Sequence, residues 1–331
     1  MDESHLLTLL AERNVAAAAK LLKDPSTPPE VLNKTDAWGK NALHLAALEK
    51  MPAVCNLLLH RPDFAGVDAS DMYNMSTMHY AAESGLGDIC EAILARSDFT
   101  SVNDIGVQGW SVLHLAAKRG LTSTCRLLLA RRSGLRDEVV DAADTYAGMT
   151  ALHWAAMNGW VAVCHVLLSR DSRFSAINAK EKEGGMTALH LAAVKGLGPV
   201  ARLLLDRPDF TAADAQDNDG ETALHWAAWK GHLDVCELLL QHPGFDAPGV
   251  LNAIDNDGMT ALRLALKSNN REVPVEILLR NTFIFLRDRT RCIAHAQLAT
   301  ARIIILALVL WQCVMAGAAS CARAAPRRAP A

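Results

Sequence analysis

The sequence lacks the motifs that mark most enzyme classes. It has no phosphate-binding loop of the Walker type and no Gly-x-Gly-x-x-Gly after a strand, and neither Gly-x-Ser-x-Gly nor His-Glu-x-x-His occurs. Nothing in the sequence therefore argues for catalysis. We expect a protein that is not an enzyme, with no cofactor, no bound metal and no small-molecule substrate.

The cysteines show no short Cys-x-x-Cys spacing, although there are 8 of them, and no N-terminal signal sequence is found. This usage fits a reducing compartment better than a disulfide scaffold. We expect the main body of the protein to be cytoplasmic.

The chain also lacks a strong charge of one sign. Lys and Arg number 33 against 36 Asp and Glu, so the net charge is -3 and gives no global electrostatic reason for a nucleic-acid partner. Hydrophobic residues make up 51% of the 331 residues and charged residues 21%, so the chain can bury a large core. A folded protein without a nucleic-acid partner is expected.

One nine-residue string recurs along the chain. GMTALHWAA begins at Gly148, GMTALHLAA at Gly185 and GETALHWAA at Gly220, and four looser copies begin at positions 39, 74, 109 and 258. Successive copies are 35 to 39 residues apart, and a fixed period in this range indicates a solenoid or array. The sixth residue of each copy is His44, His79, His114, His153, His190, His225 and Arg263.

The residues around this marker predict two helices in each unit. Before it stands a residue that can cap a helix N-terminus, an effect of roughly 1 kcal/mol, and an Ala pair that follows the marker lets neighbouring helices approach closely. Eleven residues after the marker comes a Cys in five copies, within a second apolar stretch, and a Phe that we expect to fill the seam beneath the helices follows in most copies. The caps are Asn41, Ser76, Ser111, Thr150, Thr187, Thr222 and Thr260, and the cysteines are Cys55, Cys90, Cys125, Cys164 and Cys236.

This unit resembles the ankyrin repeat, which has a hairpin turn, a Thr-Pro-Leu-His-like helix start and a second Leu-rich helix. Here Ala or another residue replaces the usual Pro, and the longer period implies longer loops on one edge. The resemblance implies an all-α ankyrin-repeat solenoid of stacked helix-turn-helix units with hairpin-like loops. We predict an N-terminal capping helix pair in residues 1–35, seven repeats in 36–285 and a basic and apolar tail in 286–331.

The histidines and cysteines invite a metal-site interpretation, which the geometry disfavours. Neighbouring helices lie about 8 to 10 Å apart, whereas zinc ligands must all lie roughly 2.0 to 2.3 Å from one ion. We therefore expect the histidines to be structural, as in the resembling family, and the cysteines to be buried small apolar residues. Asp-Asn-Asp-Gly at 217–220 and at 255–258 does not place calcium ligands at the first and twelfth loop positions, so these strings are expected to be turns.

The resemblance also implies where a protein partner would bind. In ankyrin arrays the hairpin tips and the ends of the first helices form a concave strip, with the framework residues behind it. Aromatic, Met and Arg side chains are enriched in interface cores. The predicted partner-binding residues are Trp38, Lys40, Tyr73, Met75, Trp110, Lys118, Arg119, Tyr146, Met149, Met157, Met186, Lys195, Trp229 and Lys230. Trp154 and Trp226, which directly follow the marker His, are expected to pack within the array instead.

The C-terminal part differs from the repeats in charge and pattern. Residues 281–331 hold seven Arg and one Asp, a net charge of +6, whereas the preceding 280 residues carry -9. Residues 303–322 contain no charge, and a helix of that length would span about 30 Å, the thickness of a bilayer core. A membrane anchor, a helix that covers the end of the solenoid and a tail without function are the alternatives.

The sequence thus predicts a non-enzymatic protein-interaction scaffold or adaptor that binds a protein partner through its concave strip. The alternative is a membrane-tethered adaptor or a membrane-protein subunit, in which residues 303–322 anchor the repeats on the cytosolic face. The two differ in whether the chain partitions with membranes.

Overall fold

The computed structural model describes residues 5–130, 134–169, 172–243 and 252–268. The chain divides into two compact units, Met1–Ile277 and Leu278–Ala331. All described residues belong to the first unit, and the stretch 303–322 lies outside them. No helix within the described ranges is long and apolar enough to cross a membrane.

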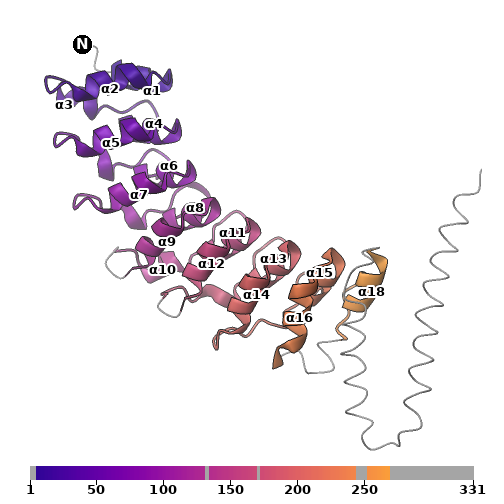
Figure 1. Ribbon diagram of the computed structural model, residues 1–331. Helices are drawn as coiled ribbons and strands as arrows, with labels where there is room; N and C mark the ends of the chain where they lie inside the picture. The colour runs from indigo at the N-terminus through magenta and orange to yellow at the C-terminus, as the bar shows by residue number, and fades with distance from the viewer. Residues whose placement is uncertain (1–4, 131–133, 170–171, 244–251, 269–331) are drawn as a thin grey trace, which may run out of the picture. The chain divides into compact units, whose positions relative to one another are not determined.

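The first unit is a stack of helix pairs, each pair lying beside the next (Figure 1). Each repeat contributes a first helix that begins after the capping residue, and in the first six repeats a second helix returns beside it. The first helices are α4 (Ala42–Leu48), α6 (Thr77–Glu83), α8 (Val112–Arg119), α11 (Ala151–Met157), α13 (Ala188–Lys195), α15 (Ala223–Lys230) and α18 (Ala261–Lys267). The second helices are α5 (Pro52–His60), α7 (Gly87–Leu94), α9 (Thr122–Leu129), α12 (Val161–Leu167), α14 (Gly198–Leu205) and α16 (Leu233–Gln241).

Stacking follows the predicted order. Every first helix contacts the next first helix from α4 to α18, and every second helix contacts the next from α5 to α16. The Ala pairs lie at these contacts, and both members, such as Ala155 and Ala156, are fully buried. Because Ala removes side-chain bulk, adjacent helices can approach closely and bury the Leu residues beside them. This is the all-α solenoid that the repeat pattern predicted.

An additional helix pair precedes the first repeat. It consists of α1 (His5–Ala11) and α2 (Val15–Lys23), which contact each other, and α1 also contacts α4 while α2 contacts α5. Leu6 and Leu10 of α1 are fully buried, whereas the opposite face of the pair is polar or exposed. The pair therefore covers the apolar end of the first repeat, as a capping unit must.

The loops after the second helices contain short helices of their own. These are α3 (Pro29–Leu32), η1 (Gly66–Asp68), η2 (Ser101–Asn103), α10 (Asp137–Val140) and η5 (Ala176–Asn178). Phe64, Phe174 and Phe210 are buried beneath these loops, and Phe99 is half-buried. The additional residues of the longer period therefore form loops with a packed apolar core.

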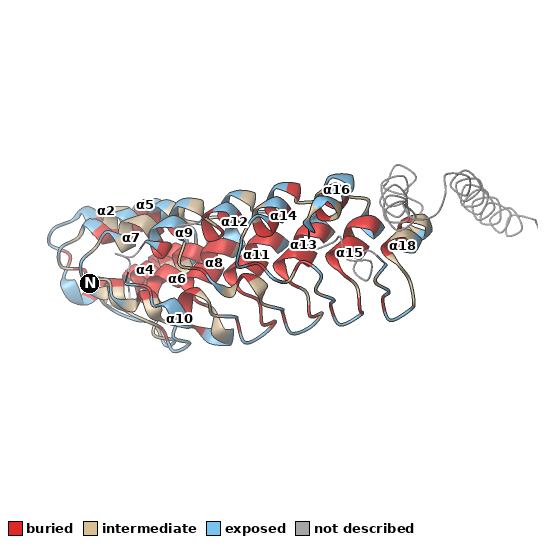
Figure 2. Ribbon diagram, turned by 90° about the horizontal axis from the view of Figure 1, so that it is seen from below, coloured by how far each residue is buried: buried red, intermediate tan, exposed pale blue. Residues whose placement is uncertain are grey.

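The turns before the first helices are narrow hairpins that extend from one side of the row of first helices (Figure 2). One antiparallel bridge closes each turn, from Thr35 with Asn41 in the first to Ile254 with Thr260 in the seventh. The residue before the last of each turn takes a positive φ, as at Gly39 with 82°, and Asn74 takes the same conformation with 56°; in the longer fourth and fifth turns this residue is the fifth, Gly148 and Gly185. Another short helix, η3 (Val107–Gly109), forms the tip of the third turn.

Candidate functional site

The turns are held rigid by their first residue. The carboxylate of Asp71 accepts hydrogen bonds from the backbone N–H groups of Tyr73 and Met75 at 2.9 and 3.0 Å, which closes the turn from inside. Equivalent bonds form in the other turns that begin with an acidic residue. These residues are Asp36, Asp144, Glu181, Asp217 and Asp255. The Asp-Asn-Asp-Gly strings are thus turns, as predicted. The carboxylates of Asp217 and Asp255 accept hydrogen bonds from the backbone N–H groups of their own turns.

An aromatic residue of the first helix fixes several of these carboxylates from the other side. The Trp154 indole N–H donates to Asp144 Oδ2 and the Trp226 indole N–H to Asp217 Oδ2, both at 2.8 Å. The Tyr80 hydroxyl donates to Asp71 in the same way, at 2.6 Å. Trp154 and Trp226 are half-buried. Their predicted structural role is therefore confirmed: each indole bonds a turn to the first helix that follows it.

Consecutive turns are also joined by their backbones. The Met72 N–H donates to the Trp38 carbonyl at 3.0 Å and the Val107 N–H to the Tyr73 carbonyl at 3.1 Å. A backbone bond recurs at every later step up to Asn256, which donates to the Asp219 carbonyl at 2.9 Å, but in the longer fourth and fifth turns the acceptor is the fourth residue, Ala147 or Gly184. We call the side chains at the third position of each turn the tip row. Its members are Trp38, Tyr73, Gln108, Tyr146, Glu183, Asp219 and Asp257.

The predicted partner-binding residues differ in their exposure. Eight are exposed: Trp38, Tyr73, Arg119, Tyr146, Met157, Lys195, Trp229 and Lys230. Five are half-buried: Lys40, Met75, Trp110, Lys118 and Met186. Met149 is only 6% exposed, so it does not offer its side chain at the surface, whereas Met186 at the equivalent position of the fifth turn is half-buried. We therefore remove Met149 from the strip.

Trp110 and Lys118 form a packed cluster rather than two separate contacts. The Trp110 ring lies 4.8 Å from the Trp154 ring between centroids, and Lys118 Nζ lies 4.6 Å from the centre of Trp110. Lys118 and Arg119 both reach Glu83 of the preceding repeat, at 3.5 and 2.7 Å. These side chains join three repeats, so part of the predicted strip stabilises the stack.

The marker histidines link each cap to the following repeat. His190 Nδ1 accepts from the Thr187 backbone N–H at 3.1 Å, and its Nε2 lies 3.1 Å from the Glu221 carbonyl of the next turn. An Nδ1 that accepts requires the proton on Nε2, so Nε2 donates to that carbonyl. His44, His153 and His225 make the same pair of contacts, whereas the buried Nε2 atoms of His79 and His114 have no acceptor at hydrogen-bonding distance in the described part of the chain.

Burial keeps these histidines neutral. It lowers the pKa of His44, His79, His114 and His153 to about 4 and lowers the pKa of His190 and His225 as well. Among the residues that the structure describes, no group of three His, Cys, Asp or Glu side chains could hold a metal ion. The histidines serve as helix caps, which is the structural role expected of them.

The cysteines of the second helices are buried, as predicted. Cys55, Cys90, Cys125, Cys164 and Cys236 are all fully buried and free. Burial raises the pKa of Cys55, Cys90, Cys164 and Cys236 to about 12 and raises that of Cys125 further still. Because the thiolate is the reactive form, these thiols are inert at neutral pH.

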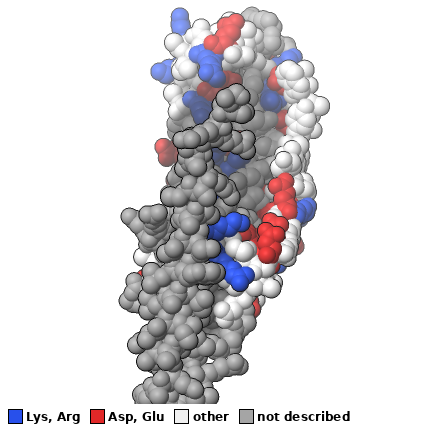
Figure 3. All heavy atoms as spheres, turned by 90° about the vertical axis from the view of Figure 1, so that its right-hand side faces the viewer, with Lys and Arg blue, Asp and Glu red and all other residues white. Residues whose placement is uncertain are grey.

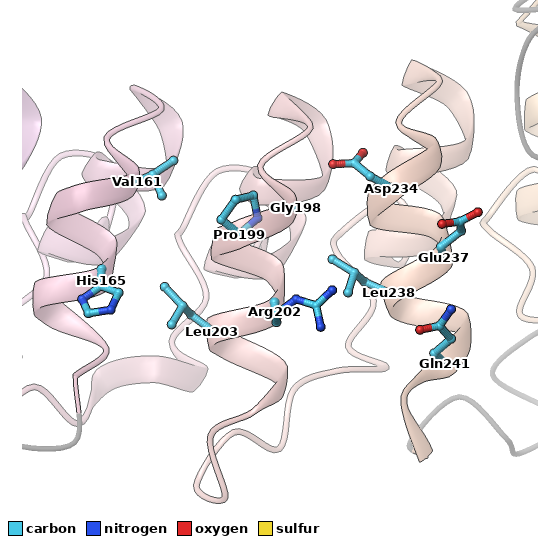
Figure 4. Close-up of a pocket in the computed structure, with 10 residues that line it drawn as sticks. All are labelled: Val161, His165, Gly198, Pro199, Arg202, Leu203, Asp234, Glu237, Leu238 and Gln241. Atoms are coloured by element: carbon cyan, nitrogen blue, oxygen red, sulfur yellow. The ribbon is translucent and has the colours of Figure 1, made fainter.

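A groove lies on the side of the second helices, between α12, α14 and α16 (Figure 4). Its volume is about 650 Å³, and its lining mixes Arg202 and Leu203 with Glu237 and Leu238. Figure 4 shows the Arg202 side chain directed from α14 toward α16. None of the predicted partner-binding residues lines this groove, so it is separate from the strip.

Charges of both signs alternate over the described surface that faces the viewer in Figure 3, among many uncharged residues. At the sixth and seventh turns, in contrast, several carboxylates lie close to one another and repel each other. Burial and then the neighbouring carboxylates, Asp217 first, raise the pKa of Glu221 to about 7. This acidic end of the array was not separated from the average charge in the sequence-based prediction.

An arginine that joins the repeats was missed by the sequence reasoning. Arg207 Nη1 donates to the Leu168 and Ser169 carbonyls of the preceding repeat at 3.1 Å each, and its other nitrogens hold Asp209 at 2.8 and 2.6 Å. Arg61 and Arg96 do the same in their repeats. The signal is present in the sequence as Arg-x-Asp-Phe at 61–64, 96–99 and 207–210.

These features define a class of protein whose stacked helix pairs present a rigid row of turns. A family description of ankyrin repeats, in sets of three copies, matches residues 5–104, 78–180, 172–248 and 212–288. The matches together cover most of the chain, and the protein belongs to the ankyrin repeat family. No curated protein matches the chain. Ankyrin repeats generally mediate protein–protein interaction and typically form non-enzymatic interaction modules.

Proposed function

We propose that the protein is a non-enzymatic scaffold or adaptor that binds a protein partner through the strip formed by the turn tips and the ends of the first helices. One observation carries this proposal: large aromatic side chains are exposed on the first, second and fourth turns, whose backbones are fixed. Trp38 is 54% exposed, Tyr73 48% and Tyr146 67%. Exposed aromatic side chains in a row are typical of interfaces rather than of solvated surface.

Rigidity explains how such a strip would bind. The carboxylate of Asp71 and the bond from the Met72 N–H to the Trp38 carbonyl hold the second turn before a partner arrives. A fixed binding surface loses little conformational entropy on association, so more of the contact energy contributes to affinity. Each repeat adds a further turn to the same surface, and the contact area therefore grows with the number of repeats.

The test compares exposed apolar residues on the two sides of the stack. Tyr73→Ala with Tyr146→Ala changes the strip, whereas Leu127→Ala with Leu233→Ala changes the second helices, where Leu127 is 42% and Leu233 39% exposed. Full-length variants would be used to capture proteins from cell lysate, with quantitative mass spectrometry. We expect the tip variant to lose the captured proteins and the control variant to keep them, while circular dichroism shows both folded. Equal capture by both variants would contradict the proposal.

A membrane-tethered form of the same adaptor is the second candidate. It is favoured by the sequence of residues 303–322, which contains no charged residue and is flanked by Arg302 and Arg323. Under this proposal, deletion of residues 286–331 moves the protein from the membrane fraction to the supernatant when lysates are separated by flotation. An unchanged distribution would remove this candidate and leave the untethered scaffold.

A further inference from the structure

The tip row carries two kinds of side chain in separate parts. Aromatic residues occupy it in the first, second and fourth turns, as Trp38, Tyr73 and Tyr146. Acidic residues occupy it in the fifth, sixth and seventh turns, as Glu183, Asp219 and Asp257. All six of these side chains are exposed. The row therefore has an apolar part and an acidic part on one continuous backbone ladder.

The carboxylates that begin the turns of the apolar part are bound within their own repeats, and Asp36, which is half-buried, accepts from the backbone N–H groups of Trp38 and Lys40. Asp71 and Asp144 are buried and bonded to Tyr80 and Trp154, respectively. Met72 and Val107, which stand beside the tip row, are 65% and 50% exposed. Exposed apolar side chains thus continue from one turn to the next, which is the kind of patch that a partner covers.

The acidic part consists of carboxylates that form no ion pair within the described residues. Asp219 and Asp257 are exposed and Glu221 is half-buried, whereas Asp217 and Asp255 are buried and accept bonds from their own turns. Burial, and then these four aspartates, raise the pKa of Glu221. An incoming cation would relieve this repulsion, because opposite charge favours the ionised carboxylate.

The dimensions of the row limit what can occupy it. Adjacent helices stack about 10 Å apart, so five repeat steps from Trp38 to Asp219 correspond to roughly 50 Å. An extended chain rises about 3.3 Å per residue and covers that length with about 15 residues, whereas a helix at 1.5 Å per residue needs about 33. A short extended segment fits the row better than a helix.

We propose that the tip row binds an extended segment of a partner protein that carries apolar side chains in one half and Arg or Lys in the other. The apolar half lies over Trp38, Tyr73 and Tyr146, and the basic half over Asp219 and Asp257. This inference rests on the proposed function and adds the chemistry of the partner to it. Nucleic acid is repelled by the acidic turns, and an acidic protein segment is excluded for the same reason.

The experiment uses the full chain and labelled synthetic peptides of about 20 residues in fluorescence anisotropy. The probe peptide has a Leu/Phe block, a Gly/Ser spacer and an Arg/Lys block, and it is made in both block orders, of which the tighter is used. One comparison peptide has Glu in place of the basic residues, and another has Ser in place of the apolar ones. We expect the probe peptide to bind at least tenfold more tightly than either comparison peptide, and equal binding of all three would overturn the proposal.

Variants of the protein then show which part of the tip row binds each half of the probe peptide. Asp219→Asn with Asp257→Asn should weaken the probe at least fivefold and should not weaken the Glu peptide, because it removes charges that repel that peptide. Trp38→Ala with Tyr73→Ala should weaken the probe and leave the Ser peptide unchanged. Asp206→Asn with Glu237→Gln removes two exposed carboxylates from the second-helix side and should change nothing. If this control pair weakens the probe as much as the tip pair, the attraction comes from overall charge and the proposal is wrong.

Proton linkage gives an independent readout. A basic segment over Glu221 lowers its pKa from about 7, so binding of the probe releases a proton and becomes tighter from pH 6 to pH 8. Glu221→Gln should abolish this dependence. Binding by the wild type that does not change across this range would contradict the placement of the basic half. If the tip variant loses its captured proteins but these bind through acidic or uncharged segments, the proposed function stands and this inference fails.

Discussion

The ring of Trp110 packs against the ring of Trp154 in the next repeat, with 4.8 Å between centroids, and Lys118 Nζ lies over both rings at 4.6 and 5.5 Å. Trp110 belongs to a turn and Trp154 to a helix, so the pair joins a tip to the framework of its neighbour. A residue that the repeat pattern assigns to a binding surface therefore also holds two repeats together.

Trp110→Ala is expected to destabilise the array by about 1 to 3 kcal/mol, because it removes an aromatic pair and a cation–π contact. Tyr146→Ala, at a side chain that is 67% exposed, should change the unfolding free energy by less than about 0.5 kcal/mol. Urea unfolding followed by circular dichroism measures both. Equal midpoints for the two variants would show that the stacked pair contributes nothing to stability.

The histidine caps differ in a way that mutation can resolve. His190 bonds at both ring nitrogens, whereas the Nε2 of His114 has no hydrogen-bond acceptor among the residues that the structure describes. His190→Leu should therefore cost about 1 kcal/mol more than His114→Leu, which is the contribution of one further hydrogen bond. The check is the difference between the two unfolding free energies, and the reverse order would contradict this account of the links between repeats.

Stability is expected to fall as the pH falls from about 6.5 to about 4. In the unfolded chain the marker histidines protonate near 6.5, but in the folded chain burial lowers the pKa of four of them to about 4. The unfolded state then binds more protons in this window, so the stability that is fully present above pH 6.5 is lost on acidification, on the order of several kcal/mol. Denaturant titrations at pH 7.5, 6 and 5 test this.

Glu221 acts in the opposite sense. Its folded pKa of about 7 lies above its ordinary 4.5, so its contribution to stability is present below pH 4.5 and is lost as the pH rises through 7. Glu221→Gln should therefore steepen the loss of stability between pH 6.5 and 4.5. A variant whose profile is the same as or shallower than that of the wild type would show that the pKa of Glu221 is not raised in the folded protein.

The Arg-x-Asp-Phe strings predict a large effect from a single surface arginine. Arg207, with a side chain 16% exposed, supplies two carbonyl bonds and an ion pair with Asp209. Arg207→Ala should cost about 1 to 3 kcal/mol, and Arg207→Lys should recover little of it because Lys lacks the planar fork. Arg126→Ala, at an exposed position on α9, is the control and should be nearly neutral. Full recovery by Lys would mean that charge alone matters.

The repeat pattern of the sequence predicted the fold well, because each feature of the pattern depends on residues close to it in the chain. The caps, the Ala pairs and the buried cysteines each depend on neighbours within one unit, and seven copies repeat the same information. The site was predicted less completely, because the exposure of a turn side chain depends on which side chains of the next repeat pack against it. Whether Trp110 is free is decided by Trp154, which lies 44 positions later, and Met149 is buried although Met186, at the equivalent position of the equally long fifth turn, is half-buried. A comparison of corresponding positions across the turns would have revealed the change from aromatic to acidic tips.

The ladder between turns uses only main-chain atoms: the Met72 N–H meets the Trp38 carbonyl, and the Asn256 N–H meets the Asp219 carbonyl. Side chains in the tip row can therefore be exchanged without disturbing the bonds that align it. Substitutions in the tip row can therefore change binding specificity one turn at a time, while the fold of the array stays the same.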